Sequence, residues 1–183
     1  MSHVGVGPPD TGRRWTIGRV LVVLAVVVFV VFWTYALFFA SKEAVNKIGD
    51  RAWARRAEAV CAEANEERGE LTDLRVVDPD RPGMLGERAD LVDRATDIVE
   101  QMLDDVIAET PADEKGRAIV PLWESEYRQY VANRRVFADE LRAGRNEPFR
   151  ETAIDGIPIS ERLETFAGDN EMESCAPPRD LSL

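Results

Sequence analysis

The sequence predicts an all-α protein, in which a single N-terminal transmembrane helix continues into a four-helix-bundle-like domain. Three observations predict this fold class: a long uncharged apolar run, several later segments with apolar residues at helical spacing, and no convincing strand-like alternation. The resulting domain organisation is a disordered cytoplasmic tail over residues 1–19, a transmembrane helix over 20–40, a helical extracytoplasmic domain over 41–178 and a C-terminal tail over 179–183.

The apolar run from Val20 to Ala40 contains no charged residue. As a helix it is about 31 Å long, close to the thickness of a bilayer's hydrocarbon core. A buried core helix rarely runs this long without a polar face, and the apolar part of a cleaved signal peptide is shorter. For a cut after Ala40, Phe38 also occupies the −3 position, where a signal peptidase needs a small residue. We therefore expect an uncleaved anchor, with membrane lipid as its partner.

Basic residues flank both sides of this run, so counting positive charges alone does not orient the anchor. The three preceding arginines are close to it, whereas the following basic residues belong to a large domain, and large domains translocate largely regardless of charge. We therefore expect a cytoplasmic N-terminus, a single pass through the plasma membrane and an extracytoplasmic C-terminal domain.

The chain is strongly acidic, with a net charge of −11. The first 19 residues contain three arginines and one aspartate, so residues 20–183 carry −13. Nucleic acid is not an expected partner, because phosphate binding needs a basic surface that releases counterions. The basic residues are nearly all arginine, which is typical of a high-GC bacterial genome.

Four helical segments are expected after the anchor. The first continues from the membrane as a stalk over residues 41–71, and a loop rich in proline and glycine follows over 73–86. The second helix spans residues 87–109, and the third runs from Ala118 or Pro121 to Ala143, where Gly144 stops it. Residues 145–158 look irregular, and Ser160 is expected to cap a short last helix that Gly168 ends.

The two cysteines, Cys61 and Cys175, suggest a disulfide, because an even count beyond a membrane anchor is typical of an oxidising compartment. Such a bond would tie the end of the domain to its first helix. Two unrelated buried thiols are the main alternative. A redox pair is a further alternative, although the chain lacks Cys-x-x-Cys spacing.

Two sequence segments carry a resemblance to a known group of proteins. They are AEAVCAEANEERGEL, residues 57–71, and FAGDNEMESCAPP, residues 166–178. The chain resembles uncharacterised actinobacterial single-pass envelope proteins, in which two cysteines bracket a helical extracytoplasmic domain. The resemblance implies an external helical domain with a Cys61–Cys175 pair, and it implies no activity.

The sequence lacks the common catalytic and cofactor-binding motifs. His3, in the N-terminal tail, is the single histidine, so imidazole catalysis and imidazole metal ligation are not expected. There is also no phosphate-binding glycine loop, EF-hand spacing or nucleophile elbow. We therefore predict a protein that is not an enzyme and holds no cofactor. An enzyme that uses carboxylates alone would need an acidic pair with raised pKa values in a cleft.

Three groups of side chains could bind something, although each also has a plain structural reading. Glutamates 63, 66, 67 and 70 could hold a cation or simply form a solvated helix face. Asp78 and Asp80 could bind calcium weakly or take part in an ordinary turn. The third group could line a ligand cleft or belong to the core, with a carboxylate partner expected for the arginine if it is buried; its members are Trp123, Tyr127, Tyr130 and Arg134.

Two functions follow from these patterns. The first is an interaction or accessory module of the cell envelope, with an envelope protein as its unidentified partner. The second is an extracytoplasmic binding or sensor domain for a small cationic or apolar ligand, which would use the cleft near Arg134 and the aromatic face.

Overall fold

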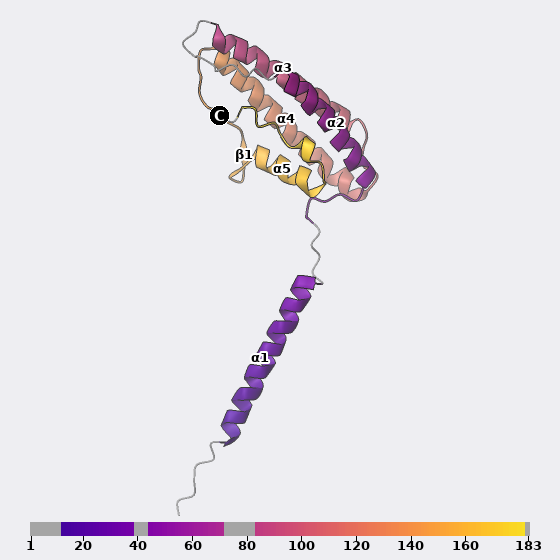
Figure 1. Cartoon of the computed structure of the whole chain (residues 1–183), viewed down its shortest axis with the longest axis vertical. Coiled ribbons are helices and arrows are strands. Elements are labelled where there is room, and N and C mark those ends of the chain that lie inside the picture. Colours follow the sequence, from indigo (N-terminus) through magenta and orange to yellow (C-terminus); the bar gives the residue numbers. More distant parts are fainter. Residues whose placement is uncertain (1–11, 39–43, 72–82, 182–183) are drawn as a thin grey trace, which may run out of the picture. The chain divides into compact units, whose positions relative to one another are not determined.

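The computed structural model describes residues 12–38, 44–71 and 83–181, with side chains from residue 17 onward. The chain divides into two compact units, residues 1–43 and 44–183, and the described residues are mostly helical (Figure 1). The helices are α1 (Gly12–Phe38), α2 (Arg51–Glu70), α3 (Met84–Ile107), α4 (Glu114–Arg142) and α5 (Ile159–Asp169). A short 3-10 helix, η1 (Glu173–Cys175), and two short strands, β1 (Ala153–Ile154) and β2 (Ile157–Pro158), complete the second unit.

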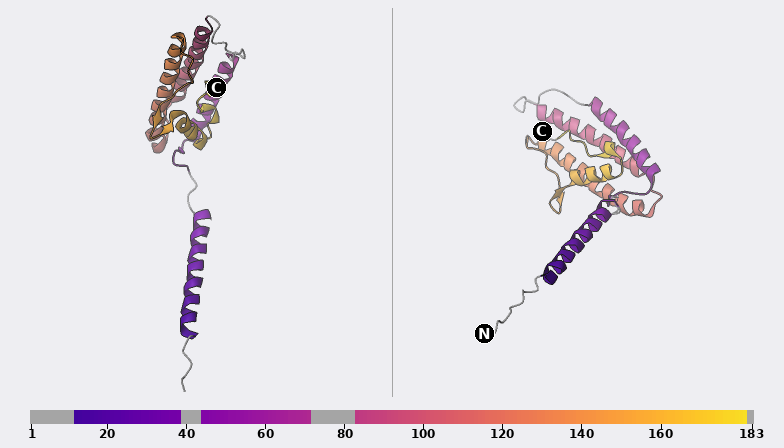
Figure 2. Two further views of the ribbon diagram at one scale, coloured as in Figure 1. Left: turned by 90° about the vertical axis from the view of Figure 1, so that its left-hand side faces the viewer. Right: turned by 60° about the horizontal axis from the view of Figure 1, so that its bottom comes forward.

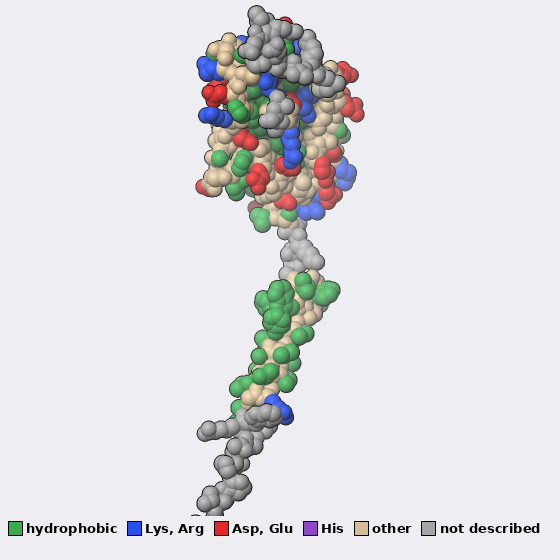
Figure 3. All heavy atoms as spheres, turned by 60° about the vertical axis from the view of Figure 1, so that its left-hand side comes forward, with side chains coloured by type: hydrophobic (Ala, Val, Ile, Leu, Met, Phe, Trp, Pro, Cys, Tyr) green, Lys and Arg blue, Asp and Glu red, His purple; other side chains and the backbone are tan. Residues whose placement is uncertain are grey.

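Helix α1 contains a segment, Ile17–Phe38, that is long and apolar enough to cross a membrane. None of this segment is buried within the structure, and hydrophobic side chains cover α1 in Figure 3. The helix begins at Gly12, so residues 12–19 are helical and the predicted disordered tail is wrong there. Residues 1–11 lie outside the described part of the chain.

The predicted stalk, a helix continuing from the anchor through residue 71, is wrong. Residues 44–50 form turns and bends, and a separate helix, α2, begins at Arg51. The carboxylate of Asp50 accepts hydrogen bonds from the backbone amides of Ala52 and Trp53. Asp50 is therefore the N-cap of α2, and its side chain satisfies amides that a preceding helical turn would otherwise bond.

Helices α3 and α4 form the centre of the second unit and run antiparallel, joined by a short connection over residues 108–113 (Figures 1 and 2). Their direction follows from two contacts: Arg142 at the end of α4 bonds Asp90 near the start of α3, and Arg128 bonds Asp104 near its end. Helix α2 packs on α3, and α5 packs on α4. The four helices α2 to α5 correspond to the four segments predicted from periodicity.

The starts of α2 and α4 are tied to each other by two aspartates. Asp113 is the N-cap of α4 and accepts a hydrogen bond from Gly116, while the backbone amide of Asp50 also donates to it. In return, Asp50 accepts from the amide of Ala112. Each carboxylate therefore stabilises both helix starts, and backbone hydrogen bonds, led by that from Ala112, lower the pKa of Asp50.

Two features of the segment before α5 differ from the sequence prediction. The residues expected to be irregular include the β1–β2 hairpin, whose turn, Asp155-Gly156, has positive φ angles of 54° and 80°. The expected N-cap, Ser160, instead lies within α5, which begins after Pro158. Ser160 donates two hydrogen bonds, through its amide and hydroxyl, to the carboxylate of Glu151.

The core lies between the helices and contains one large and one small cluster of buried side chains. The large cluster includes Trp53, Val99, Leu103, Trp123, Tyr127 and Leu163. The small cluster consists of Ala89, Val92, Phe137, Ala138, Leu141 and Leu181. Because Leu181 belongs to the second cluster, the C-terminal segment takes part in the core rather than trailing from it.

Candidate functional site

Cys61 and Cys175 form a disulfide with an S–S distance of 2.05 Å, which confirms the predicted pair. Cys61 lies on α2 and Cys175 in η1, and both are fully buried. Polar contacts reinforce this link, because Glu58 of α2 accepts hydrogen bonds from the amide and hydroxyl of Ser174. The disulfide therefore fixes the chain that follows α5 against α2.

The predicted aromatic set lies inside the domain. Trp123, Tyr127 and Tyr130 are each 3% exposed or less, and their rings meet in edge-to-face pairs along α4. Burial is the main cause that raises the pKa values of both tyrosines, so the hydroxyls remain protonated. These rings form part of the core, and Tyr127 lines no open surface.

Arg134 is fully buried and has the carboxylate partner that its position demands. Its two terminal nitrogens donate to the carboxylate of Asp180 at 2.6 and 3.0 Å, and its Nε donates to the hydroxyl of Thr96 at 2.9 Å. Arg68 is a second, more distant cation at 3.6 Å from Asp180. Burial raises the pKa of Asp180, but the bonds and charge of Arg134 outweigh it and leave that pKa below its ordinary value.

The space beside Tyr130 and Arg134 is filled by the chain's own C-terminal segment. The Tyr130 hydroxyl donates a 2.7 Å hydrogen bond to the carbonyl of Pro178, two residues before Asp180. Leu181 follows directly and packs into the small apolar cluster. The expected carboxylate partner of Arg134 is therefore present, but the chain's own C-terminal segment lies where the sequence analysis allowed for a ligand cleft.

A cavity of about 310 Å³ lies beside α5, further toward the start of α4. Its floor includes the stacked rings of Trp123 and Phe166, whose centroids are 5.4 Å apart. Leu122 and Ile157 are also among its lining residues and are 64% and 41% exposed. Of the predicted cleft residues, Trp123 therefore contacts an open cavity, whereas Arg134 does not line it.

Charged groups flank this cavity unevenly. Arg162 forms an ion pair with Glu126, and Glu161 contributes a further carboxylate to the lining. The indole Nε1 of Trp123 is buried without a hydrogen-bond partner among the described residues. The cavity therefore combines an apolar floor with a small excess of negative charge, and it suits an apolar group that carries a positive charge.

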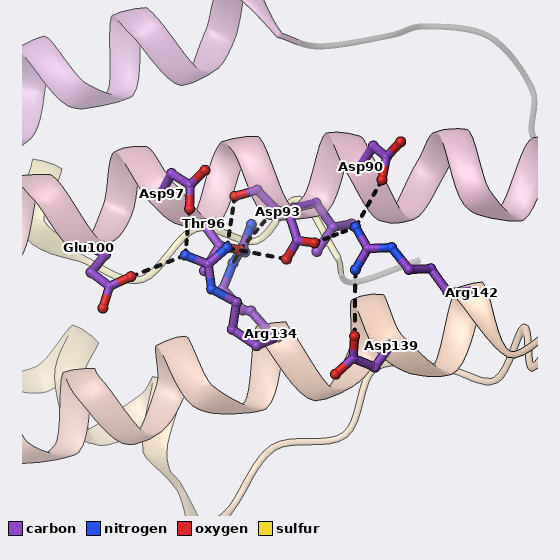
Figure 4. Close-up of polar contacts among 10 residues, drawn as sticks. Asp90, Asp93, Thr96, Asp97, Glu100, Arg134, Asp139 and Arg142 are labelled. Atoms are coloured by element: carbon purple, nitrogen blue, oxygen red, sulfur yellow. Dashed lines mark hydrogen bonds and ion pairs between the residues drawn. The ribbon is translucent and has the colours of Figure 1, made fainter.

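A row of ion pairs covers the outer junction of α3 and α4. Arg142 bonds Asp90 and Asp93 (Figure 4). Arg135 bonds Asp93, Asp97 and Glu100. The acidic residues recur at intervals of three and four along α3, and the arginines are seven apart on α4, so each set lies on one helix face. The two arginines offset about half of the charge of the four carboxylates, so the row remains acidic. The sequence did not reveal it, because its members lie on two helices that only the fold brings together.

The remaining predicted cation sites have no supporting geometry in the described chain. Glutamates 63, 66, 67 and 70 are exposed on α2, and no group of three or more potential metal ligands converges among the described residues. Asp78 and Asp80 lie outside the described residues.

Comparison with known proteins finds no counterpart for the chain. No protein-family model matches it, and neither a curated protein nor a solved structure does.

Proposed function

We propose that the protein is a membrane-anchored, non-enzymatic envelope protein whose acidic helical domain acts as an interaction or accessory module. In this proposal, α1 crosses the plasma membrane once, the N-terminus is cytoplasmic and residues 44–183 form a four-helix-bundle-like domain outside the membrane. The buried disulfide supports this orientation, since such bonds persist in oxidising compartments. We also propose that the protein is related to the actinobacterial single-pass envelope proteins that its sequence resembles.

The observation that carries the interaction role is the apolar rim of the α4–α5 cavity. Large exposed hydrophobic side chains are few among the described residues of the domain: Val45, Leu122, Val136 and Ile157. Two of these four, Leu122 and Ile157, line the same cavity. Exposed apolar side chains that gather around a concave surface favour contact with another molecule, whereas a single exposed residue has no such meaning.

Quantitative co-purification of the full-length protein from membranes in mild detergent tests this role. The Leu122→Glu variant should lose a stoichiometric envelope partner that the wild-type protein retains. Val136→Glu is a matched control, because Val136 is 57% exposed on the same helix but does not line the cavity. A set of co-purifying proteins that is the same for both variants would contradict the proposal.

The orientation needs its own test, because both native cysteines are buried. A cysteine introduced at Arg150, whose side chain is 81% exposed, should react with a membrane-impermeant maleimide in intact cells. A cysteine introduced at Ser2 should react only after the cells are permeabilised. The reverse pattern would place the domain in the cytoplasm.

The alternative function is extracytoplasmic binding of a small ligand, and the stacked rings of Trp123 and Phe166 beside the carboxylate of Glu161 in the cavity lining favour it. Benzyltrimethylammonium, an aromatic quaternary cation, is a suitable probe. Its binding should raise the melting temperature of the wild-type protein more than that of the Glu161→Gln variant. An equal shift in the two proteins would remove this alternative.

A further inference from the structure

The six residues from Ala176 to Leu181, here called the C-terminal strap, are held chiefly by side chains of α3 and α4. The Tyr130 hydroxyl bonds the carbonyl of Pro178, and the Arg134 guanidinium bonds the carboxylate of Asp180. The side chain of Leu181 packs in the small apolar cluster. The strap itself is neither helix nor strand.

The groups that hold the strap form an ordered row. Tyr130 and Arg134 are four residues apart on α4, and Phe137, Ala138 and Leu141 of the apolar cluster follow on the same buried face. The groups of the two segments therefore pair in the same order: the hydroxyl with a carbonyl, the guanidinium with a carboxylate, and the apolar pocket with an aliphatic side chain. This arrangement favours a peptide in which an aliphatic residue follows an acidic one over peptides that lack this pair.

The guanidinium is oriented by a group outside the strap. Thr96 of α3 donates its hydroxyl hydrogen to the carbonyl of Val92 at 2.6 Å, so its oxygen accepts the 2.9 Å bond from Arg134 Nε. The two terminal nitrogens of Arg134 remain directed at the carboxylate (Figure 4 shows Arg134 beside Thr96). Such a fork binds a carboxylate with two parallel bonds, which gives directional specificity as well as strength.

The strap has the properties of a bound peptide. Pro177 and Pro178 lack amide hydrogens and favour an extended backbone, so the segment loses little conformational entropy when it docks. Arg179 is exposed and pairs with Glu164 at the surface, and the Asp180 side chain remains 29% exposed. Water therefore reaches the edge of the central ion pair, whereas Pro177, Pro178 and Leu181 of the strap are buried.

We propose that a peptide-binding site, which the strap occupies in cis, is formed by Thr96, Tyr130, Arg134 and the α3 and α4 residues of the small apolar cluster. Its ligand in trans is an extended segment of a partner protein with proline followed, two residues later, by an acidic and then an aliphatic residue. The Cys61–Cys175 disulfide holds the strap beside the site, so a partner competes against a high local concentration. Close confinement in one membrane supplies the concentration that a partner segment needs.

This site uses other residues than the α4–α5 cavity, although its partner in trans rests on the proposed function of a membrane-anchored interaction module. The test uses the full-length protein in mild detergent and a fluorescent, C-terminally amidated peptide of sequence APPRDL, which corresponds to residues 176–181. The Asp180→Asn/Leu181→Ala variant, whose own strap is weakened, should bind this probe at least about ten-fold more tightly than the wild-type protein does. A probe that carries the same two substitutions should bind neither protein.

Two further variants show which site the probe occupies. Adding Arg134→Lys to the weakened strap should lower probe affinity, because lysine keeps the charge but lacks the two-pronged geometry. Adding Leu122→Glu should leave probe affinity unchanged, which separates this site from the α4–α5 cavity.

Hydrogen–deuterium exchange of the wild-type protein provides a second readout that needs no substitution. Excess probe should speed exchange at the strap amides of Arg179, Asp180 and Leu181 while α3 and α4 remain protected. Failure of a folded, weakened-strap variant to bind the probe would overturn the proposal, as would loss of its helical structure. A dimer that disappears with Asp180→Asn would also overturn it, since a second copy would then be the occupant.

Discussion

Removal of the Cys61–Cys175 disulfide should destabilise the domain more than any single surface substitution. The bond joins residues 114 positions apart in the sequence. In the chain-entropy model, the closed loop then contributes about 5 kcal/mol at 25 °C by restricting the unfolded chain. We expect the Cys61→Ala/Cys175→Ala variant to lose about 3–5 kcal/mol, because residual structure in the unfolded chain reduces the entropic gain.

Urea unfolding followed by circular dichroism measures this loss. The variant's transition midpoint should fall, and its melting temperature should drop by roughly 10–20 °C for a domain of this size. The matched control is the wild-type protein unfolded in the presence of a dithiol reductant, which should behave like the variant. Alanine rather than serine is the appropriate replacement, because both cysteines are fully buried and serine would add two buried hydroxyls.

A stability loss below about 1 kcal/mol would refute the reasoning, since the loop would then contribute almost nothing to the unfolded-state entropy. Equal stability of the oxidised and reduced wild-type protein would refute it as well.

Three further predictions concern separate parts of the domain. The folded-state pKa of Asp180 is lowered, so the stability that its carboxylate contributes is complete above its unfolded pKa near 4 and is lost as pH falls through the folded value. Asp180→Asn should therefore cost about 2 kcal/mol at pH 7 in urea unfolding, and this cost should shrink as pH falls below about 4. Gly116→Ala should cost about 1–3 kcal/mol by the same measurement, because its Cβ would lie 2.6 Å from that of Pro111, whereas Gly69→Ala, with open space around it, should be neutral or stabilising. Arg135→Ala should cost less than about 1 kcal/mol and even less in high salt, because its three carboxylate partners are partly exposed. A cost above about 3 kcal/mol for Arg135→Ala, or none for Gly116→Ala, would contradict these two accounts.

Helical periodicity predicted the helices of the domain well, because each has one apolar face that the others cover. The stalk prediction failed for a local reason. Val45 and Ile48 continue the apolar spacing toward α2, but the cap signal at Gly49-Asp50 interrupts the helix. The hairpin before α5 was missed because two-residue strands are too short for an alternating pattern, although Asp155-Gly156 is a typical hairpin turn.

The site around Arg134 was predicted only in part, because one of its residues lies on a periodic helix and the other in a segment without periodicity. Arg134 lies on a periodic helix face, so its burial and its need for a carboxylate could be read from the sequence. Asp180 follows two prolines in a segment without periodicity, 46 residues later, so no spacing rule connects the two. The same reasoning explains Ser160, whose expected capping role was replaced by bonds to Glu151 in a non-helical segment.

The end of the domain holds together parts of the chain that are far apart in sequence. Asn170 is fully buried and accepts a hydrogen bond from Ile48 while donating to the carbonyl of Asn46, so it fixes the segment that leads into α2. The disulfide then joins η1 to α2, and Asp180 neutralises the buried charge of Arg134. Each of these contacts requires residues after position 169, whereas Asp50 and Asp113 already join the starts of α2 and α4 without them. The last segment therefore docks onto helices that are already in contact. Because long loops must close before such contacts stabilise anything, this final docking should be the slow step of folding.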